Sequence, residues 1–229
     1  RGRIMSKLTA LRMLCDHPDL VKHSANIYSP LTGEGSAYAF DLKDMGYLDA
    51  PLKPVKLEVL KDYVDNFLSD YEGNKIVIFT SYVKMVDLIA DALPYTSAKY
   101  TGRMSAKEKE KSKVQFQTDP ACRVLISSDA GGYGVDLPQA NLLINYDLPW
   151  NAGLSVQRNG RIKRASSTWN HIVIQDILIR GSIEERQHAL LQQKTAIANA
   201  VVDGEGINDR GGVNLTAGSL RSFLQTAMI

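Results

Sequence analysis

Two short apolar runs that each end in polar residues constrain the fold of this chain more than any other feature. Residues 124–126 (Val-Leu-Ile) are followed by a Ser-Ser pair, and residues 142–144 (Leu-Leu-Ile) by Asn-Tyr-Asp. Unbroken apolar runs of this length are typical of strands buried on both faces of a parallel sheet. Comparable runs at 76–79 and 171–175 alternate with helical patterns of ten or more residues. We therefore predict an α/β fold, a doubly wound parallel sheet flanked by helices.

Polar residues stand where the predicted strands end. They are Thr80, Ser81, Gly102, Arg103, Ser127, Ser128 and Asp147. A parallel sheet brings the carboxyl ends of its strands to one edge, and ligands bind there. Hydroxyls at such an end, beside the amino terminus of a helix, can bind a phosphate. For Thr80 and Ser81, capping of the helix that follows is an equal alternative.

A glycine-rich segment and a pair of arginines suggest what the edge binds. Residues 129–134 hold three glycines, which let the backbone turn tightly and approach a ligand closely. Gln157, Arg161 and Arg164 follow at helical spacing on one face. Two guanidinium groups presented in this way suit a phosphate, because each stays charged and binds oxygens through a planar fork.

The composition sets wider limits. At 229 residues the chain can bury one good core with appendages. The net charge is only +2, so a nucleic-acid surface would have to be a local patch. No apolar run approaches the length of a membrane span, and Cys15 and Cys122 lack zinc or disulfide spacing. We expect no membrane partner, no metal site and an intracellular location: cytoplasm or nucleoid in a prokaryote or phage, nucleus in a eukaryote.

We expect three regions along the chain. They are a helical lead-in with an irregular connector (1–50), the sheet domain (51–203) and a linker with a short C-terminal helix (204–229). Pro18 is expected to stop the first helix. Residues 24–54 are expected to be irregular, with a short helix at most near 41–45. Because the chain opens with Arg-Gly-Arg and no Met, we expect a fragment of a longer protein.

The motifs occur in the order found in one known family. Residues 127–137 resemble motif V of superfamily-two helicase-type ATPases, D-L-P-W-N at 147–151 resembles the D-x-x-W-N signature, and 157–164 resemble motif VI (Q-x-x-x-R-x-x-R). L-R-M-L-C-D-H-P-D-L at 11–20 is similar to the lead-in of the Swi/Snf-like double-stranded DNA translocases, and G-S-I-E-E-R at 181–186 to their G-T-x-E-E-R phrase. The chain thus resembles the C-terminal RecA-like lobe of that family. It departs from the family after Arg164, where Gly-Gln is missing.

The resemblance implies a role for each residue. Arg161 and Arg164 would be arginine fingers, with Gln157, Gly134 and Asp136 on the nucleotide side of the cleft. Thr80, Ser81, Gly102, Arg103, Ser127 and Ser128 would face the DNA backbone, and Asp147, Trp150 and Asn151 would couple the two sites. A core position for Trp150 is an even alternative.

The resemblance also implies partners. ATP and Mg²⁺ would bind between two lobes, held mainly by an N-terminal RecA-like lobe, and the backbone of double-stranded DNA would cross both. The chain has no G-x-x-x-x-G-K-[ST] loop and no acidic D-E-x-H-type box, so we expect it to be inactive alone. The expected function is the C-terminal motor lobe of an ATP-dependent DNA translocase. The alternatives are a lobe of a strand-separating DNA or RNA helicase and a non-catalytic nucleic-acid interaction module.

Overall fold

The computed structural model describes residues 2–129, 131, 135–163 and 167–202. The chain divides into two compact units, one formed by Val55–Leu178 and the other by Arg1–Pro54 with Ile179–Ile229. These divisions differ from the expected boundary after residue 203, because the long helix that follows Leu178 groups with the N-terminal helices. The expected linker and helix at 204–229 lie outside the described residues.

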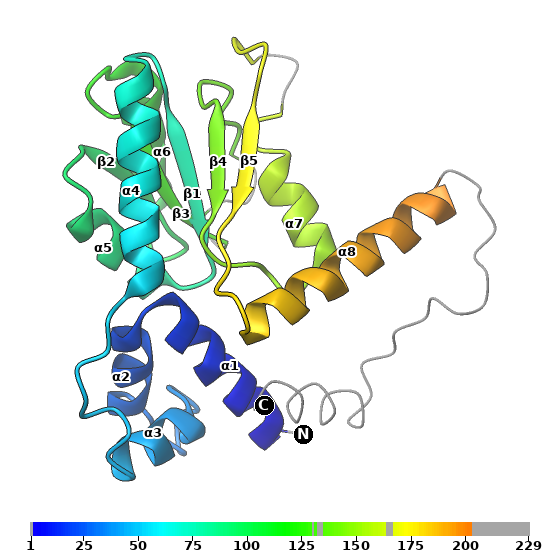
Figure 1. Cartoon of the computed structure of the whole chain (residues 1–229). Coiled ribbons are helices and arrows are strands. Elements are labelled where there is room, and N and C mark those ends of the chain that lie inside the picture. Colours follow the sequence, from blue (N-terminus) through cyan, green and yellow to red (C-terminus); the bar gives the residue numbers. More distant parts are fainter. Residues whose placement is uncertain (1, 130, 132–134, 164–166, 203–229) are drawn as a thin grey trace. The chain divides into compact units, whose positions relative to one another are not determined.

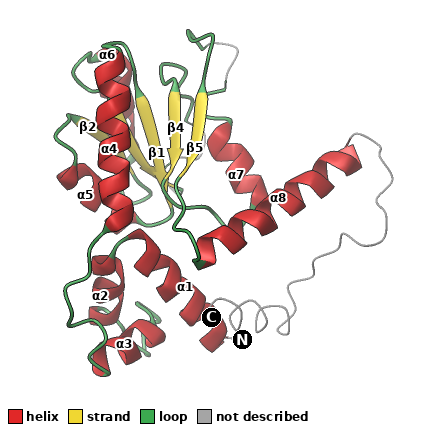
Figure 2. Ribbon diagram, viewed as in Figure 1, coloured by secondary structure: helices red, strands yellow, loops and turns green. Residues whose placement is uncertain are grey.

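The unit Val55–Leu178 is built on a five-stranded sheet in which every strand pair is parallel (Figure 2). The strands are β1 (Ile76–Thr80), β2 (Ser97–Tyr100), β3 (Val124–Ser128), β4 (Leu142–Asn145) and β5 (Val173–Asp176). Their order across the sheet is β2-β3-β1-β4-β5. The predicted parallel α/β sheet is confirmed. The run expected at 171–175 forms the shorter strand β5, which begins at Val173 and ends at Asp176.

Helices cover both faces of this sheet. They are α4 (Val55–Asp70), α5 (Val83–Ala92), α6 (Ala106–Thr118) and α7 (Ala152–Asn159). The chain moves in one direction across the sheet from β1 to β2 and in the opposite direction from β2 to β3 and from β4 to β5. Since such crossovers are right-handed, α5 lies on one face and α6 and α7 on the other. Helix α4 packs beside α5, in front of the sheet in the view of Figure 1.

The register brings the polar strand ends together. β1, β3 and β4 are buried along their whole lengths. Thr80 of β1 pairs with Ser128 of β3, and Phe79 pairs with Ser127 on one side and Asn145 on the other. The apolar residues of these strands fill the core. The polar side chains that follow them in each strand therefore all lie at the carboxyl edge.

The other unit is helical. It contains α1 (Gly2–Asp16), α2 (Pro18–Asn26), α3 (Ala37–Asp44) and α8 (Ile183–Val202). Pro18 ends α1 as predicted but also begins α2, since proline fits the first turn of a helix and His17 caps it by accepting the Asp19 N–H at 3.1 Å. The short helix expected near 41–45 is present as α3, but it begins earlier, at Ala37, because Ser36 caps it there.

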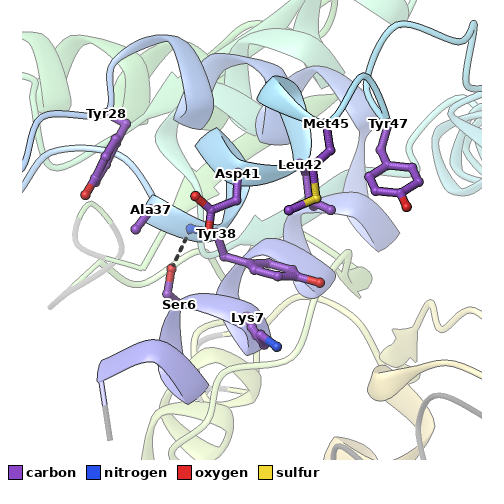
Figure 3. A pocket seen from close by; sticks show the side chains of 9 residues that line it. All are labelled: Ser6, Lys7, Tyr28, Ala37, Tyr38, Asp41, Leu42, Met45 and Tyr47. Carbon is purple, nitrogen blue, oxygen red and sulfur yellow. Dashed lines mark hydrogen bonds between the residues drawn. The ribbon is translucent and has the colours of Figure 1, made fainter.

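A groove of about 800 Å³ runs beside α1 and α3 (Figure 3). It is lined by Ser6, Lys7, Tyr28, Ala37, Tyr38, Asp41, Leu42, Met45 and Tyr47. The Tyr38 N–H donates to the Ser6 hydroxyl at 3.1 Å, and the Lys7 ammonium lies 5.1 Å from the centre of the Tyr38 ring. These contacts hold α3 against α1.

Candidate functional site

The carboxyl edge of the sheet is organised by an arginine that the sequence interpretation did not single out. Arg158, in the last turn of α7, is only 2% exposed. Its Nε donates to Asp129 Oδ1 at 2.6 Å. Nη1 donates to the Asp147 carbonyl at 2.5 Å and to Asn145 Oδ1 at 3.5 Å, and Nη2 to Ser81 Oγ at 3.3 Å and Asp147 Oδ1 at 3.5 Å. Five contacts thus match the five N–H donors of a guanidinium group.

The charge of Arg158 is secured by its neighbours. Burial by itself lowers the pKa of Arg158, but the carboxylates of Asp147 and Asp129 outweigh that effect and raise the pKa above its ordinary value. The cluster therefore holds one buried cation between two carboxylates. Removing one partner from such a buried pair typically costs about 3–5 kcal/mol, because the other charge is left without compensation.

Asp147 shapes the turn after β1. Its carboxylate accepts the Thr80 hydroxyl at 2.5 Å and both the hydroxyl and the N–H of Ser81, the latter at 2.8 Å. The Thr80 hydroxyl oxygen in turn accepts the N–H of Tyr82, which is the N-cap residue of α5. The hydroxyls of Thr80 and Ser81 therefore act inside the lobe: neither caps α5 directly, and Thr80 is fully buried.

Ser127 and Ser128 form hydrogen bonds with the end of β2 and the loop that follows it. Both side chains are buried. The Ser127 hydroxyl donates to the Tyr100 carbonyl at 3.1 Å, and the Ser128 hydroxyl accepts the Gly102 N–H at 3.3 Å. A buried hydroxyl cannot touch a DNA phosphate without rearrangement of the lobe. Direct contact therefore stays a prediction for the exposed Gly102 and Arg103.

Gly131 packs against the same loop. A Cβ at this position would lie 2.2 Å from the Tyr100 carbonyl oxygen and 2.7 Å from the Thr101 Cα. The N–H of Gly131 also donates to Ser128, both to its carbonyl at 3.0 Å and to its hydroxyl at 3.4 Å. The glycine-rich segment is thus in close contact with backbone of the chain itself at this point.

Arg161 is not on a helix, in contrast to the predicted helical spacing. α7 ends at Asn159, with Gly160 as its C-cap, so Arg161 lies in the following turn. Its side chain is partly buried, while those of Arg103 and Gln157 are exposed. Among the described residues, none of these three side chains has a hydrogen-bond or ion-pair partner. Gly134 and Arg164 lie outside the described residues, and Asp136 is exposed.

The predicted coupling residues have different surroundings. Asp147 belongs to the Arg158 cluster, as described above. Asn151 is the N-cap of α7, where its side chain accepts the Gly153 N–H at 2.8 Å. Trp150 is partly buried beside it. Asn151 therefore has a structural role that is sufficient to explain its place, whatever else it does.

Within the described residues, no group of three or more His, Cys, Asp or Glu side chains could hold a metal ion. In the same part of the chain, no helix is both long enough and apolar enough to cross a bilayer.

Comparison with known proteins gives a consistent result. Residues 55–166 match the family model of the helicase conserved C-terminal domain. The chain is 31% identical over 211 residues to the human DNA repair and recombination protein RAD54-like, covering 88% of this chain and 27% of the relative. It is 30% identical over 138 residues to the chromatin-remodeling ATPase INO80 of Saccharomyces cerevisiae (strain S288c), covering 58% of this chain and 9% of the relative. The chain thus spans less than a third of the length of these relatives.

Solved structures share the fold. The C-terminal part of the Fun30 ATPase domain has a TM-score of 0.62 at 17% identity, covering 98% of this chain and 78% of that one. The SWI2/SNF2 ATPase C-terminal domain of Sulfolobus solfataricus has a TM-score of 0.59 at 23% identity, covering 96% of this chain and 80% of that one. Family model, relatives and fold agree with the motifs, and the chain belongs to the Swi/Snf-like superfamily-two helicase-type ATPases, as their C-terminal RecA-like lobe.

Proposed function

We propose that this chain is the C-terminal motor lobe of an ATP-dependent double-stranded DNA translocase. In this proposal Arg161 reaches the phosphates of ATP bound on an N-terminal lobe, and the loop of Gly102 and Arg103 contacts the DNA backbone. The observation that carries the proposal is the state of Arg161, whose charged side chain has no partner among the described residues although its backbone is held firmly.

The backbone of Arg161 is fixed from both directions. Its N–H donates to the Arg158 carbonyl at 3.0 Å, and its carbonyl accepts the Leu137 N–H at 3.0 Å. The next residue, Ile162, is fully buried. A fixed backbone below a side chain that has no partner among the described residues is the arrangement expected of a group that acts on a ligand held elsewhere.

Phosphoryl transfer needs positive charge at the transferring group. Arg161 would supply it, and Gln157, exposed on the last turns of α7, would lie on the nucleotide side. Arg164 is proposed as the second finger from its place in the motif alone. Mg²⁺, which bridges ATP phosphates and neutralises developing charge, would be held mainly by the N-terminal lobe.

Arg103 is the described residue best placed for DNA on this lobe. It is exposed on the loop after β2, and the Gly102 N–H binds Ser128 from below. A contact to phosphate carries no sequence information, so binding should tolerate any sequence and weaken with salt. Because the proposed ligand is double-stranded DNA, we place the protein inside the cell.

The test uses the full-length protein. Arg161→Ala should lower ATP hydrolysis by about 10³- to 10⁵-fold, the usual cost of losing an arginine finger, while ATP binding persists. Lys163→Ala, two residues away and exposed, is the matched control and should leave the rate unchanged. Unchanged hydrolysis in Arg161→Ala would instead support a non-catalytic interaction module. Stimulation by RNA but not by duplex DNA would support an RNA helicase lobe.

A further inference from the structure

Arg158 connects three strand ends at once. Through Asp129 it binds the segment after β3, through Ser81 the turn after β1, and through Asp147 the segment after β4. No other described arginine of the sheet unit is as deeply buried. The planar fork is essential to this geometry, because a lysine ammonium is a single point and cannot reach all three strand ends.

The same residue begins the turn that carries the proposed finger. The Arg158 carbonyl accepts the Arg161 N–H at 3.0 Å, so the two residues are joined by one backbone hydrogen bond. A shift of the Arg158 side chain would therefore move the last turn of α7 and, with it, the point from which Arg161 extends.

Contacts also continue toward the predicted DNA loop. The Asp129 N–H donates to the Thr80 carbonyl at 3.3 Å, and the neighbouring Ser128 hydroxyl accepts the Gly102 N–H at 3.3 Å. An unbroken series of bonds thus runs from Gly102, through residues 128–129, to Arg158 and Arg161.

We propose that Arg158 is a positioning residue, whose guanidinium group sets the place of Arg161 relative to the strand ends and so determines the rate of hydrolysis rather than the binding of ATP. This inference rests on the proposed function. It assigns Arg158 no contact with ATP, and it predicts that its effect passes entirely through Arg161.

The experiment is a double-mutant cycle in the full-length protein. Arg158→Lys keeps the charge but loses the fork, and it should lower kcat about 10- to 100-fold with KM for ATP within about 2-fold, because misplacement of about 1 Å can cost that much. In the Arg161→Ala background, measured by single turnover with excess enzyme, Arg158→Lys should change the rate by less than about 2-fold.

The matched control is Arg123→Lys. Arg123 is partly buried, and it donates to the backbone carbonyls of Asn74, Leu68 and Tyr71 at the opposite edge of the sheet. Its replacement should leave kcat within about 2-fold in both backgrounds, because among the described residues its hydrogen bonds all go to that opposite edge. If Arg158→Lys does not fold, as judged by circular dichroism, Asp129→Asn takes its place. It should also lower kcat, by a smaller factor than that expected for Arg158→Lys.

The outcomes separate the two proposals. Loss of rate in Arg158→Lys, or in Asp129→Asn, that disappears in the Arg161→Ala background supports positioning. A loss that multiplies with that of Arg161→Ala, or no loss at all, overturns it and leaves the proposed function standing. Unchanged hydrolysis in Arg161→Ala alone overturns the proposed function first.

Discussion

The two edges of the sheet hold their cationic side chains in different ways. At the amino edge, the Lys75 ammonium donates to the carbonyls of Phe116, Asp119 and Cys122, at the end of α6 and just after it. Arg123 does the same for Leu68, near the end of α4. The carbonyls of Phe116 and Leu68 lie in the last turns of α6 and α4, where carbonyls lack a partner within the helix, so the cations complete these helix ends.

At the carboxyl edge, the buried cation meets carboxylates instead. Arg158 lies between Asp129 and Asp147, and a second arginine, Arg161, extends from the same turn without a partner among the described residues. The comparison teaches that cations at the amino edge are satisfied by backbone within the lobe. At the carboxyl edge an internal ion pair instead lies beside a second cation, Arg161, to which our proposal assigns a ligand.

The largest expected effect is at Asp147, whose carboxylate accepts bonds from Thr80, Ser81 and Arg158. Asp147→Ala should destabilise the lobe by about 3–5 kcal/mol, because Arg158 keeps its charge but loses a buried partner. Denaturant unfolding measures this loss. Asp147→Asn, which keeps an acceptor oxygen, should lose less. Equal stability of Asp147→Ala and the parent protein would show that Arg158 does not depend on this carboxylate.

Gly131 comes next. Gly131→Ala would place a Cβ 2.2 Å from the Tyr100 carbonyl oxygen and should cost about 1–3 kcal/mol through overpacking. The control is Gly153→Ala on α7, where the nearest atom is the Asn151 side chain at 3.2 Å. Thermal unfolding of both variants checks the difference. Unchanged stability of Gly131→Ala would show that the backbone at residue 131 can move away from Tyr100 at little cost.

At the amino edge, Lys75→Met should cost about 1–3 kcal/mol, because the carbonyls of Phe116, Asp119 and Cys122 lose a donor, and Phe116 and Cys122 are fully buried. ATP hydrolysis per folded molecule should stay the same. The measurement pairs unfolding curves with DNA-stimulated ATPase assays of the full-length protein. A fall in kcat with the fold intact would remove the functional distinction between the edges.

The smallest effect is a pH dependence. Burial lowers the pKa of Lys75 below its ordinary value of 10.5, with Cys122 and Asp119 partly opposing that shift. Between the lowered folded pKa and the ordinary pKa, the unfolded chain binds more protons, so Lys75 makes stability rise as pH rises through this alkaline window. Arg158, with its raised pKa, adds no such slope. Unfolding at several alkaline pH values should show the stability of the parent rising relative to that of Lys75→Met, because the raised pKa values of Cys122 and Tyr100 act in the opposite direction in both proteins.

Sequence patterns predicted the sheet well because its signals are local. The apolar runs at 76–79, 124–126 and 142–144 all became buried strands, since no polar residue interrupts them. α2 was missed and the start of α3 was placed too late, because the apolar residues of these short helices pack in one small cluster with α1 rather than along one long stripe.

The site was predicted in part. The polar strand ends meet at the carboxyl edge as predicted, because the strands are parallel and in register; the ligand of this edge stays a prediction. The role of Arg158 was not foreseen, since its partners lie 11 to 77 residues away in sequence and no local spacing reveals them. The one available signal was an acidic residue soon after each of two strands, at Asp129 and Asp147, together with an arginine on the helix that follows.

The anchored turn after α7 also offers a place for a reporter of the proposed motor function. Val156 lies on the same helix and is 60% exposed, and it takes no part in the hydrogen bonds of Arg158. A fluorescent dye attached to a cysteine at this position would move rigidly with the guanidinium groups nearby. Energy transfer to a second dye on the proposed N-terminal lobe would then report changes in the distance between the two lobes in real time.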